Sequence, residues 1–449
     1  MEDMNLTERL ETLQNLLEVN KDAEIRELIA ELHAADISEI VNHLSSREDR
    51  LKVFSLIDDE ELKGAVLIDL EQPLADHILE SLEVEDISQI INTMDSDDAA
   101  DIIGEIAEDN SDLAEKVLDQ IEADHKAEVL QLLKYDEDSA GGLMSSSYFA
   151  IDESMKVNDI INTIRSSEMD ELYNIWVIDS RKRLLGRISL KTVLLAKETK
   201  TAAQIMSEDY VYIDVNSKQE DVARSFEKYD LIEAPVVNDK HILLGHITVD
   251  DVVDVIEEEA EEDLLRMAGT NDEEVKEISI VKIVKARLPW LVVALLVGLC
   301  SSYIIATFHD TLERNVMVSY FITVVIAMGG NVGVQSSTVV IRGLATGDIN
   351  RVDLSYRMFK ELMVSISNGV LVSSILFLII TAWKDYYLAM VCSLSMIMSM
   401  FIAGLVGALI PFLLERLKLD PALSSGPFVT TSNDILGVLI YFSVASFFY

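Results

Sequence analysis

The residue best placed to do chemistry in this sequence is an acid, Asp434, inside the last hydrophobic segment, residues 427 to 449. A segment of this length can cross a bilayer, since roughly 20 helical residues span the hydrocarbon layer. A carboxylate there is costly to insert and usually faces a water-filled path or the interior of a helix bundle. The residues just before it all carry side-chain oxygens: Thr430, Thr431, Ser432 and Asn433. This pattern predicts a cation site, and the alternative is a protonated acid hydrogen-bonded between helices.

A second hydrophobic segment carries amide side chains at predicted membrane depth. It contains the run A-M-G-G-N-V-G-V-Q-S-S-T, in which Asn331 and Gln335 stand among three glycines. Glycines allow helices to approach closely or to unwind, while the amides supply oxygen atoms within the membrane. Close helix packing would explain the glycines but not the two amides. We therefore interpret Asn331 and Gln335 as pore-lining residues.

Two groups of acids precede the hydrophobic part of the chain. Asp97 and Asp101 lie one helical turn apart on one face of a predicted helix. A second predicted helix, within residues 248 to 269, carries acids at intervals of three and four: Asp251, Asp254, Glu258 and Glu262. Like charges at this spacing repel by about 0.2–0.5 kcal/mol per pair, and Arg266 is the one basic residue within that stretch. Divalent cations are the better candidates to neutralise the second group, with a freely solvated helix as the alternative. For Asp97 and Asp101 taken alone, a solvated acidic face is the favoured interpretation.

Charge divides the 449-residue chain into two parts. Residues from 281 onward contain 11 Lys and Arg and 9 Asp and Glu, a net charge of +2, whereas residues 1 to 280 contain 25 and 70, a net charge of −45. The first part is a polyanion that repels nucleic acid and attracts cations, because affinity for phosphate backbones comes from Lys and Arg. The second part is hydrophobic enough for a membrane domain.

Other features exclude further classes of function. The first residues have no basic region followed by an apolar run, so we expect no signal peptide and a cytoplasmic N-terminus. The cysteines, Cys300 and Cys392, both lie in apolar segments and support neither a disulfide framework nor a thiolate metal site. No motif places a nucleophile, a base and an orienting acid together, so we expect a protein that is not an enzyme.

The acidic part itself predicts two folded regions. Residues 1 to 135 have helical spacing throughout, and the segment at 36 to 44 recurs with a shift of 50 at 86 to 94, as in superhelical stacks of helix pairs. Residues 136 to 199 and 200 to 262 repeat each other at an offset of 59, each with a strand, a turn, a strand containing glycine, and a helix. This resembles a tandem CBS pair, a regulatory α/β module that often binds adenine nucleotides.

Five membrane spans are predicted in residues 281 to 449, near 289 to 308, 315 to 341, 362 to 383, 388 to 413 and 427 to 449. Nine basic residues flank the spans on the side of the N-terminus, and only Arg314 and Lys384 lie on the other side. The excess of positive charge places the N-terminus and the acidic domains in the cytoplasm and the C-terminus outside.

The order of these parts, with the motifs G-G-N-V-G-V-Q, N-D-I-L-G-V-L-I-Y-F and E-D-L-L-R-M-A-G, resembles the MgtE family of bacterial magnesium channels or transporters over essentially the whole chain. The resemblance implies a homodimeric, multi-pass protein of the bacterial inner membrane. Its fold class would be a multidomain membrane protein: an all-α superhelical N-terminal domain, an α/β tandem CBS pair, a connecting or "plug" helix within 250 to 280, and a five-helix transmembrane domain.

The same resemblance implies roles for particular residues. Asp434 of each subunit would hold a largely hydrated Mg²⁺ on the two-fold axis, and we group Asn331, Gln335 and Thr431 with it as the pore site. Regulatory magnesium sites would use the following acids: Asp97, Asp101, Asp230, Asp251, Asp254, Glu259, Glu262, Asp263 and Asp420. ATP or another adenine nucleotide is a possible ligand of the CBS pair, with no residues assigned to it.

The predicted function is uptake of Mg²⁺ through a channel or transporter that closes when cytoplasmic Mg²⁺ binds the acidic region. Two alternatives stay open. One is a cation-coupled divalent exchanger in which Asp434 binds cation and proton in turn. The other is a membrane-anchored, adenine-nucleotide-sensing CBS protein that transports nothing.

Overall fold

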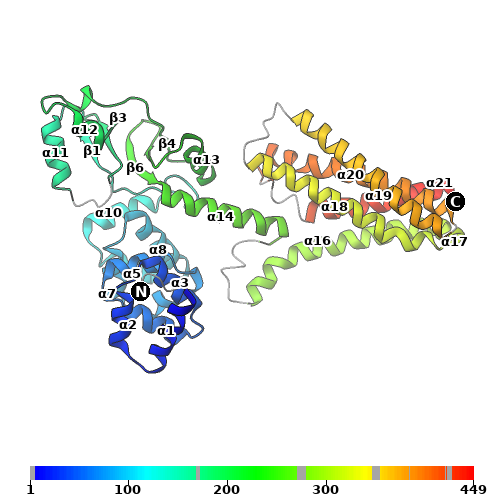
Figure 1. Cartoon of the computed structure of the whole chain (residues 1–449), viewed down its shortest axis with the longest axis horizontal. Coiled ribbons are helices and arrows are strands. Elements are labelled where there is room, and N and C mark those ends of the chain that lie inside the picture. The colour runs from blue at the N-terminus through cyan, green and yellow to red at the C-terminus, as the bar shows by residue number, and fades with distance from the viewer. Residues whose placement is uncertain are drawn as a thin grey trace. The chain divides into compact units, whose positions relative to one another are not determined.

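Figure 1 shows the computed structural model of the chain. It describes residues 6–167, 172–270, 280–345, 354–383, 385–419, 421 and 427–449. The chain divides into two compact units, Met1–Glu259 and Ala260–Tyr449.

The first part of the first unit is helical, as its sequence predicts. Its helices are α1 (Leu6–Glu18), α2 (Asp22–Ile29), α3 (Ala34–His43), α4 (Arg47–Ser55), α5 (Glu60–Ile68), α6 (Gln72–Ser81), α7 (Val84–Ile91), α8 (Ser96–Asp109), α9 (Ser111–Leu118) and α10 (Ala123–Leu132). Short helices of this kind cannot bury their apolar faces alone, so each packs on its neighbours. Residues such as Ile25, Val53 and Ile78 are fully buried between them. The repeated segments become α3 and α7, each of which packs against α5.

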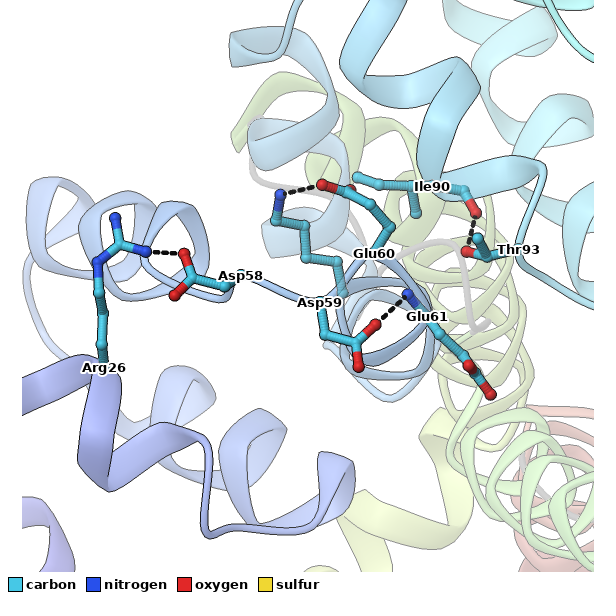
Figure 2. Close-up of polar contacts among 8 residues, drawn as sticks. Arg26, Asp58, Asp59, Glu60, Glu61, Ile90 and Thr93 are labelled. Carbon is cyan, nitrogen blue, oxygen red and sulfur yellow. Dashed lines mark hydrogen bonds and ion pairs between the residues drawn. The ribbon is translucent and has the colours of Figure 1, made fainter.

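Local polar contacts set where these helices begin. Figure 2 shows Asp59 accepting a hydrogen bond from the backbone N–H of Glu61 at 3.1 Å, which caps the N-terminus of α5. Ser46 caps α4 in the same way. The neighbouring Asp58 forms an ion pair with Arg26 of α2. A side-chain acceptor at this position satisfies an N–H that the helix itself leaves unpaired.

The rest of the first unit is two similar halves. β1 (Ala150–Asp152), β2 (Asn174–Ile178) and β3 (Leu184–Ser189) form one sheet in that order, and β4 (Ile213–Asp214), β5 (Glu233–Val237) and β6 (Leu243–Thr248) form the other. In each sheet the first pair of strands is parallel and the second pair is antiparallel. The helices are α11 (Val157–Arg165), α12 (Leu190–Leu195), the 3₁₀ helix η1 (Ala202–Gln204), α13 (Gln219–Tyr229) and α14 (Val249–Ala268). The repeat at an offset of 59 is therefore a pair of equivalent strands and helices, as predicted.

The glycine in the last strand of each half, Gly186 in β3 and Gly245 in β6, allows another backbone segment to pack closely against that strand. Ser145, from the start of the first half, pairs with His246 of β6, and Ser207, from the start of the second half, pairs with Arg187 of β3. The two halves therefore exchange these segments. A Cβ at Gly186 would lie 2.7 Å from the Ser207 carbonyl oxygen, which is too close for any side chain. Gly245 is in the same position against Ser145.

Substituting Gly245 by alanine should therefore destabilise the CBS pair. Overlap with the backbone oxygen of Ser145 forces the exchanged segment away, at a cost of about 1–3 kcal/mol. Thermal unfolding of the purified full-length protein should show a midpoint several degrees lower. Gly104→Ala is the matched control, because its Cβ would meet only Leu133 Cδ2 at 3.8 Å and alanine favours a helix. Equal midpoints for the two variants would contradict the packing argument.

Five helices of the second unit, among its described residues, are long and apolar enough to cross a membrane. They are α16 (Ile280–Thr307), α18 (Val318–Ala345), α19 (Leu354–Ala382), α20 (Tyr386–Arg416) and α21 (Pro427–Phe448), and a short helix, α17 (His309–Arg314), follows the first. α20 packs against α18, α19 and α21, and its buried face has small residues such as Ala403 and Gly407. The five predicted spans are confirmed. α16 and α19 begin nine and eight residues before the predicted spans, because hydropathy marks the lipid boundary whereas the helix continues past it.

Candidate cation-binding sites

The acids of α8 and α14 lie close enough to affect each other. Asp97 of α8 is 8% exposed, and its Oδ1 has no hydrogen-bond partner among the described residues. Burial, followed by the charges of Asp98, Asp251 and Asp95, raises the pKa of Asp97 well above its usual range. An orphaned, buried carboxylate oxygen facing other carboxylates is the donor chemistry of a hard cation.

The neighbouring acids share this electrostatic environment. Burial and the charges of Asp251 and Asp95 raise the pKa of Asp98 to about 7. Asp101 retains exposed surface, yet the protein around its carboxylate removes hydration. This loss of hydration, followed by the charge of Glu137, raises the pKa of Asp101 to about 8. A carboxylate whose pKa exceeds its usual value favours either a proton or a metal ion as a partner.

Asp251 is the member on α14 that is held in place. Its Oδ2 accepts hydrogen bonds from Thr248 Oγ1 at 2.8 Å and from the Thr248 backbone N–H at 3.2 Å. Burial nevertheless raises its pKa to about 6, and burial together with the charge of Asp69 raises that of Asp254. Asp97, Asp101, Asp251 and Asp254, predicted from two separate segments, therefore belong to one acidic cluster.

The structure gives the other predicted regulatory acids different surroundings. Asp230 is an exposed C-cap of α13 in the left-handed conformation (φ 50°). Glu259 Oε1 accepts a hydrogen bond from Gln219 Nε2 at 2.8 Å, which joins α13 to α14. Glu262 pairs with Arg266 one turn later, Asp263 is half-buried, and Asp420 lies outside the described residues.

Several acids of the cluster were not predicted from the sequence. Asp98 follows Asp97 directly, while Asp250, Glu105 and Glu137 each raise the pKa of a cluster member. Asp98 lies three residues before Asp101 and Asp250 four before Asp254, so helical spacing is consistent with both acids and does not single out either. The concentration of acids in D-S-D-D and D-D-V-V-D was the signal available.

Within the described ranges, no group of three or more His, Cys, Asp or Glu side chains is arranged to enclose a bare metal ion. Mg²⁺ does not require one, because it dehydrates reluctantly and is usually held by one or two carboxylates through retained water. The facing acids of α8 and α14 fit a hydrated Mg²⁺ better than a fully coordinated ion.

The raised pKa values predict a pH dependence. Burial, followed by the charges of neighbouring acids, raises the pKa of Asp98 to about 7 and that of Asp101 to about 8, so this compact arrangement binds protons. Without divalent ions, protection of residues 1–259 from protease should therefore increase as the pH falls from about 8 towards 6, because protonation removes the repulsion. Asp98→Asn should flatten this dependence. Protection that is constant, or that falls with pH, would contradict the assignment.

The candidate site in the membrane unit lies on α21 and α18. Asp434 is half-buried, and Thr431 Oγ1 donates to the Phe428 carbonyl at 3.3 Å. Asn331 and Gln335 are exposed on α18, which packs directly against α21. In a single chain of a membrane bundle, exposed polar groups face either a partner or water, since lipid cannot satisfy them.

Comparisons with known proteins identify the family of each part of the chain. Residues 322–444 match the family model described as a divalent cation transporter, residues 32–138 match the MgtE intracellular N domain, and residues 140–198 and 202–258 match CBS domains. The chain is 34% identical over 442 residues to the magnesium transporter MgtE of Thermus thermophilus, covering 97% of each chain. It is also 34% identical over 354 residues to the MgtE of Bacillus subtilis, covering 76% of this chain and 78% of that one.

A solved structure resembles the first unit. It is the crystal structure of the cytosolic domain of the Mg²⁺ channel MgtE in complex with ATP, which is 31% identical, with a TM-score of 0.52, and matches 55% of this chain and 99% of that chain. One relative aligns with 97% of the chain, and a family model matches most of the membrane helices. The chain therefore belongs to the MgtE family of magnesium transporters.

Proposed function

We propose that the protein admits Mg²⁺ into the cytoplasm through a pore that contains Asp434, with Thr431, Asn331 and Gln335 as further oxygen donors. The observation that carries this proposal is Asp434 itself, a half-buried carboxylate in the middle of a helix long enough to cross the membrane. A negative charge at this depth is costly unless an ion or water meets it. Few direct ligands suit Mg²⁺, which crosses such a site with much of its water.

The pore requires a second copy of the chain and a defined orientation. Asn331 and Gln335 are exposed on one chain, and a homodimer with α18 and α21 near its axis would enclose them. The excess of basic residues on one side of the spans supports an orientation with the N-terminus and the acidic domains in the cytoplasm and the C-terminus outside. Inward flow is then driven by the membrane potential, at about 2.3 kcal/mol per charge per 100 mV and twice that for a divalent ion.

Regulation follows from the acidic cluster. At low cytoplasmic Mg²⁺ the carboxylates of α8 and α14 repel, which favours separation of the N-terminal domain from the CBS pair. At high Mg²⁺ the ion binds between Asp97 and Asp251 and stabilises the contact. Because an ion shifts an equilibrium only by binding one state better, this contact has to be part of the closed state. Asp230, Glu259, Glu262, Asp263 and Asp420 are proposed as further, weaker regulatory ligands.

A second regulatory ligand is ATP or another adenine nucleotide at the CBS pair. Its support is the ATP complex named for the cytosolic domain of a related MgtE and the matching pair of CBS halves.

Magnesium flux into liposomes tests the proposal. Vesicles containing the purified protein should take up Mg²⁺ at a rate that follows the imposed membrane potential, with low magnesium in the compartment facing the acidic domains. Uptake that requires a proton or sodium gradient would instead support the coupled exchanger. Absence of uptake with nucleotide binding intact would support the membrane-anchored sensor.

A further inference from the structure

The residue before Asp434 has an unusual environment. Asn433 is 3% exposed, and neither its Oδ1 nor its Nδ2 has a hydrogen-bond partner among the described residues. A buried amide left without partners weakens the arrangement that contains it, and an apolar side chain of similar shape would be tolerated at least as well. Asn433 is therefore poorly explained as a residue that stabilises the arrangement seen here.

The packing around Asn433 is tight. A Cβ at Gly333 of α18 would collide with Asn433 Nδ2 and lie 2.9 Å from Val429 Cγ1. A Cβ at Gly407 of α20 would in turn collide with the Gly333 carbonyl oxygen. Three helices thus meet at one point with no space for a further methyl group, and the Asn433 side chain occupies the gap that Gly333 leaves.

A second orphaned group lies at the same junction. Ser365 of α19 is 1% exposed, and its Oγ has no partner within the described ranges. It packs against Gly404, one turn from Gly407 on α20. Hydrogen-bonding capacity is therefore unused on both sides of the glycine contacts.

This junction fixes the direction of the candidate pore residues. Successive residues of a helix point about 100° apart, so seating Asn433 against Gly333 sets the rotation of α21 and hence the direction of Asp434. Gly333 also lies midway between Asn331 and Gln335 on α18. A change at this contact would re-orient all three candidate pore residues together.

We propose that Asn433 is a positioning residue of the ion pathway. Its amide has no hydrogen-bond partner among the described residues in the arrangement seen here, and it gains one in the transporting arrangement of α21. A hydrogen bond that the Asn433 amide makes only in the transporting arrangement stabilises that arrangement relative to the one seen here, and so favours transport. This inference rests on the proposed role of Asp434 in the pathway.

Threonine and valine at position 433 provide a matched test, because they have nearly the same shape and only threonine donates and accepts hydrogen bonds. In full-length protein in liposomes, Asn433→Val should lower the maximal Mg²⁺ uptake rate by roughly tenfold, the order expected from about one hydrogen bond gained in a single state, and leave the half-saturating Mg²⁺ concentration unchanged. Asn433→Thr should retain a rate within about threefold of wild type. The valine variant should unfold at the wild-type temperature or above it, because it removes an unpaired amide.

Equal uptake by the threonine and valine variants would overturn the proposal, as would a marked fall in the unfolding temperature of Asn433→Val. A valine effect on half-saturation alone would also overturn it, since that would make Asn433 a direct ligand. Failure of the proposed function is a separate result. It would be seen as undiminished uptake by Asp434→Asn, whatever the position 433 variants do.

Discussion

Replacing Asp434 by asparagine is expected to reduce Mg²⁺ uptake by at least about a hundredfold. Asparagine keeps the size of the side chain and removes the charge. At an effective dielectric constant near 20, a carboxylate about 4 Å from a divalent ion contributes roughly 8 kcal/mol of Coulomb attraction, part of which offsets the ion's lost hydration. A hundredfold loss requires only about 2.7 kcal/mol of this. The measurement is initial uptake of Mg²⁺ by liposomes containing equal amounts of each protein.

Asp310→Asn is the control for this experiment. Asp310 is an exposed acid of the short helix α17 in the same unit, so the variant makes the same chemical change away from the proposed pathway. It should transport like wild type. If both variants transport normally, Asp434 is a structural acid held between helices. If both lose activity, general charge near the membrane, and not the proposed site, governs the flux.

The second large effect is expected in regulation. In the double variant Asp97→Asn and Asp251→Asn, uptake should no longer change with the internal Mg²⁺ concentration. Neutral amides remove both the repulsion that separates the domains and the charge that binds the ion, so the state of the domains no longer depends on Mg²⁺. Protease protection of residues 1–259 should likewise lose its Mg²⁺ dependence.

Asp124→Asn is the matched control for the cluster, since Asp124 is an exposed acid of α10 in the same helical domain. Its response to Mg²⁺ should equal that of wild type. A wild-type response in the double variant as well would show that Mg²⁺ acts elsewhere. Asp230, Glu259 and Asp263 would then be the next positions to test.

The sequence predicted the elements of this protein well because their signals are local. Long apolar runs can be satisfied only by helices in a membrane, and all five are present. The offset of 59 between the CBS halves appears as two sheets with the same strand order. The paired glycines at 186 and 245 were also recognisable in the sequence, although the close backbone packing that requires them was not. The exchanged segments at Ser145 and Ser207 join residues far apart in the sequence.

The sites were predicted only in part, because local signals do not show which distant residues meet. Helical spacing identified Asp97 with Asp101, and Asp251 with Asp254, as two separate faces. Only the tertiary structure decided that these faces meet, and it added Asp98. The sequence by itself determined where negative charge accumulates and that Asp434 lies in a spanning helix. Contacts between helices decided which carboxylates lose water. They also decided which face of α21 packs against Gly333, because desolvation and packing depend on neighbours that no local pattern specifies.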